Sequence, residues 1–315
     1  MTAPKKKKKK QRPVADFTTY LLVRGLVGIM HLFSIHANLR TARFLGRLLF
    51  KHYHRGRQRA IENLQASFPE KSPEWIEQTA QQSFEQIAML AIDVFCTPRL
   101  VKKSNWRNYS CFKNIEHVKW LIQEGRGLIM VTGHYGNFEI MGYMLGLFGF
   151  NIYSVARPLD NKYLSKYLYG IRERVGQKII DKKGAAELMP AIIASGAAIG
   201  FIADQDAGKK GIFVDFFGRK ASTYKSIALL AITNNLPIVV GCSRRVGNRF
   251  YFEVSCNRLI LPDEWKDKND PIRWITAEYT KAIEDFVRED PTQYWWLHRR
   301  WKHRPKEELA AAEKK

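Results

Sequence analysis

The chain has 315 residues, which is long enough to bury a full hydrophobic core. It carries 52 Lys and Arg against 30 Asp and Glu, and the net charge of +22 favours polyanionic partners such as nucleic acid, anionic lipid headgroups or an acidic protein. Four cysteines (Cys96, Cys111, Cys242 and Cys256) form no CxxC pair and no cluster with histidine, which argues against a structural zinc site and implies no disulfide. We expect them to be buried apolar residues in a reducing compartment.

The N-terminal region combines a lysine run with a long apolar segment. Lys5–Lys10 predicts a solvated, disordered tail. Phe17–Ile35 follows and has about the length that crosses a bilayer. Arg24 and His31 lie inside this segment, and a charge at the bilayer centre costs roughly 2.5–3.5 kcal/mol for insertion.

Basic residues flank this apolar segment on both sides. A single spanning helix cannot place both flanks on the cytoplasmic side, so we favour a helix lying in the membrane interface with its cations on anionic headgroups. A spanning anchor and a buried amphipathic helix of a soluble protein remain alternatives, whereas a signal peptide is disfavoured because no small-residue cleavage site follows. The second basic stretch comprises Arg40, Arg43, Arg47, Lys51, Arg55, Arg57 and Arg59.

Helical patterns occupy residues 58–98. Gln58–Ser67 has helical spacing and stops before Pro69. Ser72-Pro73-Glu74 predicts an N-cap with proline in the first helical position, and apolar residues then recur every three or four positions to about Phe95. Pro98 is expected to end this helix.

Apolar strands and helices alternate from about residue 110 onward. This alternation predicts an α/β fold with a mixed central sheet flanked by helices, preceded by the membrane-associating helix and a helical region. Expected helices are Ile115–Glu124, Phe138–Phe148, Lys162–Val175, Ala185–Ser195, Ser226–Asn235 and Pro271–Glu289. Expected strands are Gly127–Thr132, Ile152–Ala156, one beginning at Ile179, Ala198–Ala203, Ile238–Cys242 and Phe250–Val254.

The segment GHYGNFE, from Gly133 to Glu139, lies where a buried strand gives way to a helix. Ligands of α/β proteins bind at the carboxyl ends of strands, so this position alone marks a candidate site. Asn137 is a plausible N-cap, which puts Glu139 in the first helical turn and His134 in the preceding loop. Glycines on both sides of the histidine permit a sharp reversal that brings the two side chains together.

A carboxylate beside an imidazole fixes its tautomer and stabilises the imidazolium. The other ring nitrogen of His134 then takes a proton from an alcohol, which activates that oxygen as a nucleophile without a Ser or Cys on the enzyme. Taken alone, the same spacing also fits a structural histidine beside Glu139.

Four further signals occur along the chain. They are VTGHYGNFE at 131–139, ARPLDN at 156–161, ADQD at 203–206 with GIFVDFFG at 211–218, and QYWWLHRRWK at 293–302. Together these segments resemble the late acyltransferases of lipid A synthesis, a branch of the glycerolipid acyltransferases that carry an H-x4-D/E motif. The same branch includes acyltransferases of phosphatidylinositol mannosides. The similarity covers about residues 17–305.

This resemblance implies an acyltransferase in which His134 is the general base and Glu139 its partner. It also implies substrate-binding roles for Arg157, Arg172 and Asp204, because a guanidinium pins a phosphate or an oxyanion and a carboxylate holds that arginine or a sugar hydroxyl. Without it, the arginines fit surface ion pairs and Asp204 fits a turn residue or helix cap. No metal and no cofactor are implied.

The resemblance further implies the partners and the place of action. The donor is acyl carrier protein or acyl-CoA, the acceptor is a hydroxyl of a lipid A precursor, and the site of action is the cytoplasmic face of the bacterial inner membrane. The predicted organisation is a basic tail at 1–16, a membrane-associating helical region at 17–60, the α/β acyltransferase domain at 61–305 and a second disordered tail at 306–315.

Two clusters of aromatic residues each have two possible interpretations. Phe213, Phe216 and Phe217 either line an acyl channel or belong to the core. The tryptophans and cations of residues 295–304 suit a membrane interface or stacking on nucleic-acid bases. We favour the interface, and no nucleic-acid partner is expected, since no helix-turn-helix, zinc-finger or RRM signature occurs. A membrane-bound nucleic-acid-binding protein is the remote alternative, and another glycolipid acceptor is the nearer one.

Overall fold

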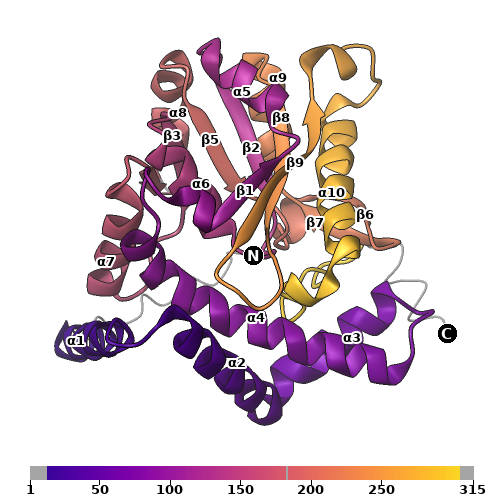
Figure 1. Ribbon diagram of the computed structural model, residues 1–315. Helices are drawn as coiled ribbons and strands as arrows, with labels where there is room; N and C mark the ends of the chain where they lie inside the picture. The colour runs from indigo at the N-terminus through magenta and orange to yellow at the C-terminus, as the bar shows by residue number, and fades with distance from the viewer. Residues whose placement is uncertain (1–12, 182–183, 306–315) are drawn as a thin grey trace.

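The computed structural model describes residues 13–181 and 184–305 (Figure 1). The lysine run and the C-terminal segment from residue 306 lie outside the described residues. A central sheet with helices on both faces fills the upper part of the view, and helices from the N-terminal third run along its lower edge. The predicted α/β fold with a mixed sheet and a preceding helical region is confirmed.

The N-terminal helices are α1 (Pro13–Met30), α2 (Ile35–His52), α3 (His54–Ser67) and α4 (Pro73–Leu100). The apolar segment predicted as one element, Phe17–Ile35, is therefore divided. Helix α1 ends at Met30, and Ser34 starts α2 by accepting a hydrogen bond from the Ala37 amide at 3.2 Å. Within the described residues, α1 is the helix long and apolar enough to cross a membrane.

Helix α4 begins as predicted but ends later. The Ser72 hydroxyl accepts from the Trp75 amide at 3.3 Å, and Pro73 occupies the first turn. The expectation that Pro98 ends the helix is wrong, because α4 continues to Leu100. A proline this close to a helix end removes one hydrogen bond of the final turn and leaves the remaining turns intact.

Within the part of the chain that the structure describes, seven strands form the main sheet in the order β1-β9-β8-β2-β5-β3-β4. Strands β8 and β9 pair antiparallel and the other neighbours pair parallel, so the sheet is mixed. The strands are β1 (Ser110–Lys113), β2 (Leu128–Thr132), β3 (Ile152–Ala156), β4 (Lys178–Asp181), β5 (Ala198–Ile202), β8 (Ile238–Arg245) and β9 (Phe252–Ile260). A separate hairpin consists of β6 (Ile212–Phe216) and β7 (Arg219–Thr223).

The remaining helices agree with the predicted ones within two residues at either end. They are α5 (Glu116–Gln123), α6 (Phe138–Leu147), α7 (Lys162–Glu173), α8 (Ala185–Ala194), α9 (Ser226–Asn234) and α10 (Pro271–Glu289). The expected strands do not include β1 or the two hairpin strands, β6 and β7, and they make β8 and β9 too short. Strand β1 at the sheet edge and strand β7 in the hairpin carry many polar residues, so they lack a continuous apolar run.

The side chains of β2 alternate between the two faces of the sheet. Ile129 and Val131 pack in one core with residues of α9 and α10, while Leu128 packs in another with residues of α5. Alternation of this kind is what buries a parallel strand on both sides. Leu64 of α3 and Phe84 of α4 belong to the same core as α9 and α10.

The aromatic residues of the hairpin also enter this core. Phe216 and Phe217 are buried and pack edge to face against each other, with ring centroids 4.9 Å apart. Phe217 also meets Trp296 at 5.5 Å. Phe216 and Phe217 are therefore core residues, and they do not line an open channel.

Candidate active site

Strand register places His134 beside Asp204. Strands β2 and β5 run parallel as neighbours, with Thr132 opposite Ile202. The residues two positions further along each chain are His134 and Asp204, so both emerge at the carboxyl edge of the sheet. The loop after β2 is fixed by its glycines: a Cβ on Gly136, whose φ is 53°, would lie 2.0 Å from the Ser243 carbonyl oxygen.

His134 and Asp204 form a close hydrogen-bonded pair. The imidazole Nδ1 lies 2.6 Å from Asp204 Oδ1, and the His134 backbone amide donates to Oδ2 at 2.8 Å. The Asp204 side chain is 1 % exposed and that of His134 is 12 % exposed. Burial by itself would raise the pKa of Asp204, but the adjacent His134 and its hydrogen bonds hold that pKa well below the ordinary value. Asp204 is therefore a carboxylate that holds the Nδ1–H tautomer, with Nε2 left to accept a proton.

Glu139 does not hold the imidazole. Its carboxylate accepts two hydrogen bonds from Arg172, from Nε at 2.8 Å and from Nη2 at 2.5 Å. Among the described residues, no hydrogen bond joins the Glu139 and His134 side chains. The expected His134–Glu139 contact is thus replaced by two pairs, because Asn137 caps α6 and Glu139 projects from its first turn toward α7.

Arg157 lies apart from these pairs. Its side chain is 80 % exposed in the loop after β3, and its nearest carboxylate is Asp160 at 3.8 Å. The structure therefore brings together His134 with Asp204 and Arg172 with Glu139, and leaves Arg157 at the surface.

Aromatic side chains surround the His134 ring. Phe138 and Trp295 lie 5.2 and 5.1 Å from it between ring centroids, and His298 lies closer, at 4.5 Å. Burial, together with His134, lowers the pKa of His298 to about 4, so this second imidazole is neutral at neutral pH. The Gln205 amide nitrogen lies 3.4 Å from His134 Nε2, which places a polar group at the proton-accepting nitrogen.

The C-terminal segment packs onto the loop that carries His134, so the expected membrane-interface position does not apply to the buried Trp296. The Trp295 amide donates to the His134 carbonyl at 3.1 Å, and Trp296 is buried. Asn63 of α3 donates to the Trp296 and His298 carbonyls at 2.8 and 3.1 Å. The segment is consequently fastened to α3 and to the loop after β2, which leaves Trp296 no access to lipid.

Arg300 holds the loop that carries Asp204. Its side chain is buried and donates to the Ser222 carbonyl at 2.7 Å, the Thr223 hydroxyl at 2.6 Å and the Gln205 carbonyl at 3.3 Å. His303 Nδ1 lies 2.7 Å from Asp206 at the end of the same loop. These contacts hold in place the loop that carries Asp204.

Three potential metal ligands lie together at the site. His134, Asp204 and His298 have ligand atoms that all lie within 4.8 Å of each other. Both oxygens of Asp204 accept hydrogen bonds from His134, and the His298 ring packs against the His134 ring. The described contacts are therefore those of a hydrogen-bonded His134–Asp204 pair with His298 beside it.

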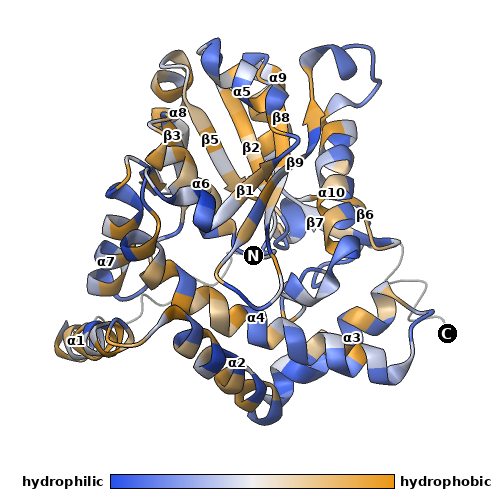
Figure 2. Cartoon of the chain, in the orientation of Figure 1, coloured by the Kyte–Doolittle hydropathy of each residue, from blue (hydrophilic) through white to orange (hydrophobic). Residues whose placement is uncertain are grey.

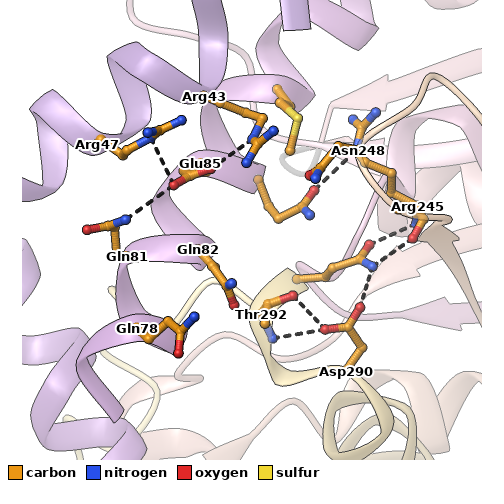
Figure 3. A pocket seen from close by; sticks show the side chains of 14 residues that line it. Arg43, Arg47, Gln78, Gln81, Gln82, Glu85, Arg245, Asn248, Asp290 and Thr292 are labelled. Atoms are coloured by element: carbon orange, nitrogen blue, oxygen red, sulfur yellow. Dashed lines mark hydrogen bonds and ion pairs between the residues drawn. The ribbon is translucent and has the colours of Figure 1, made fainter. Parts of the chain in front are cut away.

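A polar pocket of about 410 Å³ lies between α2, α4 and the turn after β8 (Figure 3). Its lining includes glutamines of α4, Arg43 and Arg47, but neither member of the dyad. Arg245 connects the pocket with the loop after β2, because its guanidinium pairs with the buried Asp93, which accepts from Asn137 at 3.1 Å. The pocket is therefore linked to the loop after β2 through Arg245 and Asp93.

Nearly the whole chain matches one family. The model of the bacterial lipid A biosynthesis acyltransferases matches residues 4–303. The chain belongs to this family. Its members with curated functions include the lipid A biosynthesis lauroyltransferase of Escherichia coli, 25 % identical over 269 residues, or 83 % of this chain and 84 % of the relative.

Two further relatives have similar coverage. The lipid A biosynthesis palmitoleoyltransferase of Escherichia coli is 25 % identical over 78 % of each chain. A lipid A biosynthesis acyltransferase of Haemophilus influenzae is 26 % identical over 82 % of each chain. The protein is thus an acyltransferase of lipid A biosynthesis by family.

Sequence reasoning about this lipid A acyltransferase did not single out His298 and Gln205, which lie beside His134, or Arg300, which contacts the loop that carries Asp204. Each lies in a segment that carries the family resemblance, ADQD or QYWWLHRRWK. The signal was present in the sequence, but cations among tryptophans were interpreted as a membrane surface. Their contact with the loop after β2 depends on the fold.

Proposed function

We propose that this lipid A acyltransferase moves a fatty acyl chain from acyl carrier protein, or coenzyme A, to a hydroxyl of a lipid A precursor, with His134 as the general base and Asp204 as its partner. The observation that supports this most directly is the 2.6 Å contact between His134 Nδ1 and the buried Asp204 carboxylate. It leaves Nε2 as the proton acceptor in a 12 % exposed side chain.

The proposed reaction needs no covalent enzyme intermediate. The acceptor hydroxyl loses its proton to His134 Nε2 while its oxygen attacks the thioester carbonyl. The resulting tetrahedral oxyanion collapses, the C–S bond breaks, and the imidazolium returns the proton to the leaving thiolate. Asp204 stabilises the imidazolium throughout, and the neutral His298 adds no opposing positive charge.

Substrate binding is assigned to the second pair. Glu139 holds Arg172 by Nε and Nη2, which orients the guanidinium and leaves Nη1 for a phosphate of the acceptor or the developing oxyanion. Glu139 thereby acts as a positioning residue for Arg172. The amide of Gln205, close to Nε2, is a second donor for the oxyanion. Arg157 at the exposed loop is proposed to meet the anionic headgroup or carrier.

The charge of the chain supports anionic partners. A surface with a net charge of +22 attracts acidic acyl carrier protein, the phosphates of a glycolipid and an anionic membrane. We place the enzyme at the cytoplasmic face of the bacterial inner membrane, where donor and acceptor meet.

The test is acyl transfer by the purified protein, followed by lipid mass spectrometry. A lipid A precursor with acyl carrier protein as carrier is expected to gain one acyl chain, and parallel reactions with acyl-CoA and with a phosphatidylinositol mannoside separate the donors and the acceptors. His134→Ala is expected to abolish transfer while the far-UV circular dichroism stays unchanged. Normal turnover by a folded His134→Ala protein would remove the mechanism.

A further inference from the structure

Helix α1 has the length of a bilayer-spanning segment, but its contacts with the rest of the protein favour a helix that lies in the plane of the membrane. Its 18 residues extend about 27 Å at about 1.5 Å per residue, close to the roughly 30 Å hydrocarbon thickness. A spanning helix of this length would have Asp16 and Met30 near opposite membrane surfaces. The attachment of these two ends to the rest of the protein therefore decides the orientation.

The N-terminal half of α1 is attached to α7. Asn161, the N-cap of α7, donates to the Asp16 carbonyl at 2.8 Å. Phe17 packs edge to face on Tyr163, with ring centroids 5.2 Å apart. Near the middle of α1, the Arg24 guanidinium lies 5.0 Å from the centre of the Tyr167 ring. Three successive turns of α1 thus face the α/β body.

The C-terminal end of α1 is attached to the same body through α2 and α4. Asn38 of α2 donates to the Met30 carbonyl at 2.9 Å. His31, directly after the helix, lies 3.3 Å from the Phe95 carbonyl of α4 through Nε2, and its own carbonyl accepts from Arg99. Both ends of the potential span are therefore held by one folded unit.

These attachments are incompatible with a helix that crosses the membrane. To span, α1 would have to carry the adjacent surface of α7 through the hydrocarbon, including the exposed Lys162 and Lys166 next to Tyr163 and Tyr167. Charged side chains in that region are strongly disfavoured. An in-plane helix avoids this, and it leaves Arg24 at headgroup depth.

The outward side of α1 and α2 is apolar and basic. In Figure 2 both helices carry apolar residues along the lower edge of the molecule. Exposed Arg40 and Lys51 of α2 lie in the same helix as this apolar surface, which suits anionic headgroups. The exposed apolar side chains are Leu21, Leu22, Leu26 and Ile29 of α1, Leu32 and Phe33 of the turn, and Phe44, Leu45, Leu48 and Leu49 of α2.

We propose that α1 and α2 form a monotopic docking face, in which α1 lies in the plane of one leaflet of an anionic bilayer and both of its ends stay on the same side. This extends the proposed function, because it states how the enzyme meets the membrane that holds its acceptor. The evidence for the docking face is the set of contacts that hold both ends of α1, and it does not depend on the chemistry of His134 and Asp204.

The first experiment measures on which side each end lies. Ala15→Cys and His36→Cys, both at exposed positions, are made separately in a Cys111→Ser/Cys256→Ser background and treated with a membrane-impermeant maleimide in intact spheroplasts and in lysed membranes. If α1 lies in one leaflet, Ala15→Cys and His36→Cys are expected to show the same labelling in intact spheroplasts and the same labelling in lysed membranes. Labelling of one position and protection of the other in intact spheroplasts would show a spanning helix and overturn it.

The second experiment measures binding to vesicles of phosphatidylethanolamine and phosphatidylglycerol. Leu22→Gln/Leu26→Gln replaces two leucines that are 64 % exposed, and Leu188→Gln/Leu229→Gln is the matched control with leucines 52 and 41 % exposed on α8 and α9. Loss of two interfacial leucines is expected to weaken binding roughly 10- to 100-fold, with the control unchanged. Equal effects in both variants would refute the docking face.

The acyl transfer assay separates this proposal from the proposed function. With acceptor dispersed in detergent, Leu22→Gln/Leu26→Gln is expected to retain the activity of the unmodified protein, because neither leucine contacts the dyad. An unmodified protein without activity but with the expected labelling and vesicle binding would refute the proposed function and leave the docking face standing.

Discussion

Replacement of Asp204 by asparagine keeps the shape of the side chain and removes its charge. When His134 takes the proton from the acceptor, an imidazolium forms beside a carboxylate that is 1 % exposed and 2.6 Å from Nδ1. With about 4 Å between the charge centres and an effective dielectric constant of about 20, their attraction is about 4 kcal/mol. Loss of this attraction in the transition state corresponds to about a 10³-fold decrease in kcat.

Glu139→Gln is the matched comparison, since it also replaces a carboxylate by its amide. This substitution weakens the ion pair between Glu139 and Arg172, in which the Glu139 side chain is 20 % exposed and that of Arg172 is 24 % exposed. Weakening of such a partly exposed bidentate contact costs about 1.5 kcal/mol, or about tenfold, and is expected mainly in KM for the acceptor. The two substitutions are therefore predicted to differ about 10³-fold in kcat and about 100-fold in kcat/KM.

The assay is the initial rate of acyl transfer from acyl carrier protein to the lipid A precursor, measured over a range of acceptor concentrations. Circular dichroism and thermal unfolding establish that both variants are folded. If Glu139→Gln lowered kcat as strongly as Asp204→Asn, or more strongly, the assignment of Asp204 as the partner of His134 would be refuted. That outcome would favour Glu139 as the partner during turnover.

Three other predictions concern stability. Gly136→Ala is expected to destabilise the protein by about 3 kcal/mol in urea unfolding, because its Cβ would meet the Ser243 carbonyl, whereas Gly149→Ala, with positive φ but open space, should cost about 1 kcal/mol. The pKa of His298 is lowered from 6.5 to about 4, so as the pH falls the unfolded chain takes up this proton before the folded chain does. The contribution of the neutral His298 to the free energy of unfolding is therefore complete above pH 6.5, and it decreases by at most about 3 kcal/mol between pH 6.5 and 4. A His298→Gln variant whose stability has the same pH dependence as the unmodified protein would contradict this. Arg300→Met removes three hydrogen bonds, two of them buried, and is expected to cost about 3 kcal/mol in the same unfolding assay. A loss under about 1 kcal/mol would argue against its role in fixing the Asp204 loop.

Local signals in the sequence determined most of the element boundaries. Ser72 and Asn137 cap their helices with the side-chain bonds that their residue types predict, and α10 begins at Pro271 as expected. Strand β3 has the predicted bounds, because a short apolar run between two turns is itself the signal of a buried strand. The family resemblance was likewise readable from short segments of the chain.

The hydrogen-bond partner of His134 was decided by tertiary structure. Glu139 is five residues from His134 and was the natural candidate in the sequence, but the cap at Asn137 turns it toward Arg172. Asp204 is 70 residues from His134 in the sequence and reaches it because β5 pairs with β2. Spacing along the chain does not encode which strands become neighbours, so the residue types at the site were readable from the sequence while their pairing was not. The basic residues inside and beside the apolar segment already favoured an interfacial helix, whereas the contacts of α1 with α7 and α4 depend on the fold.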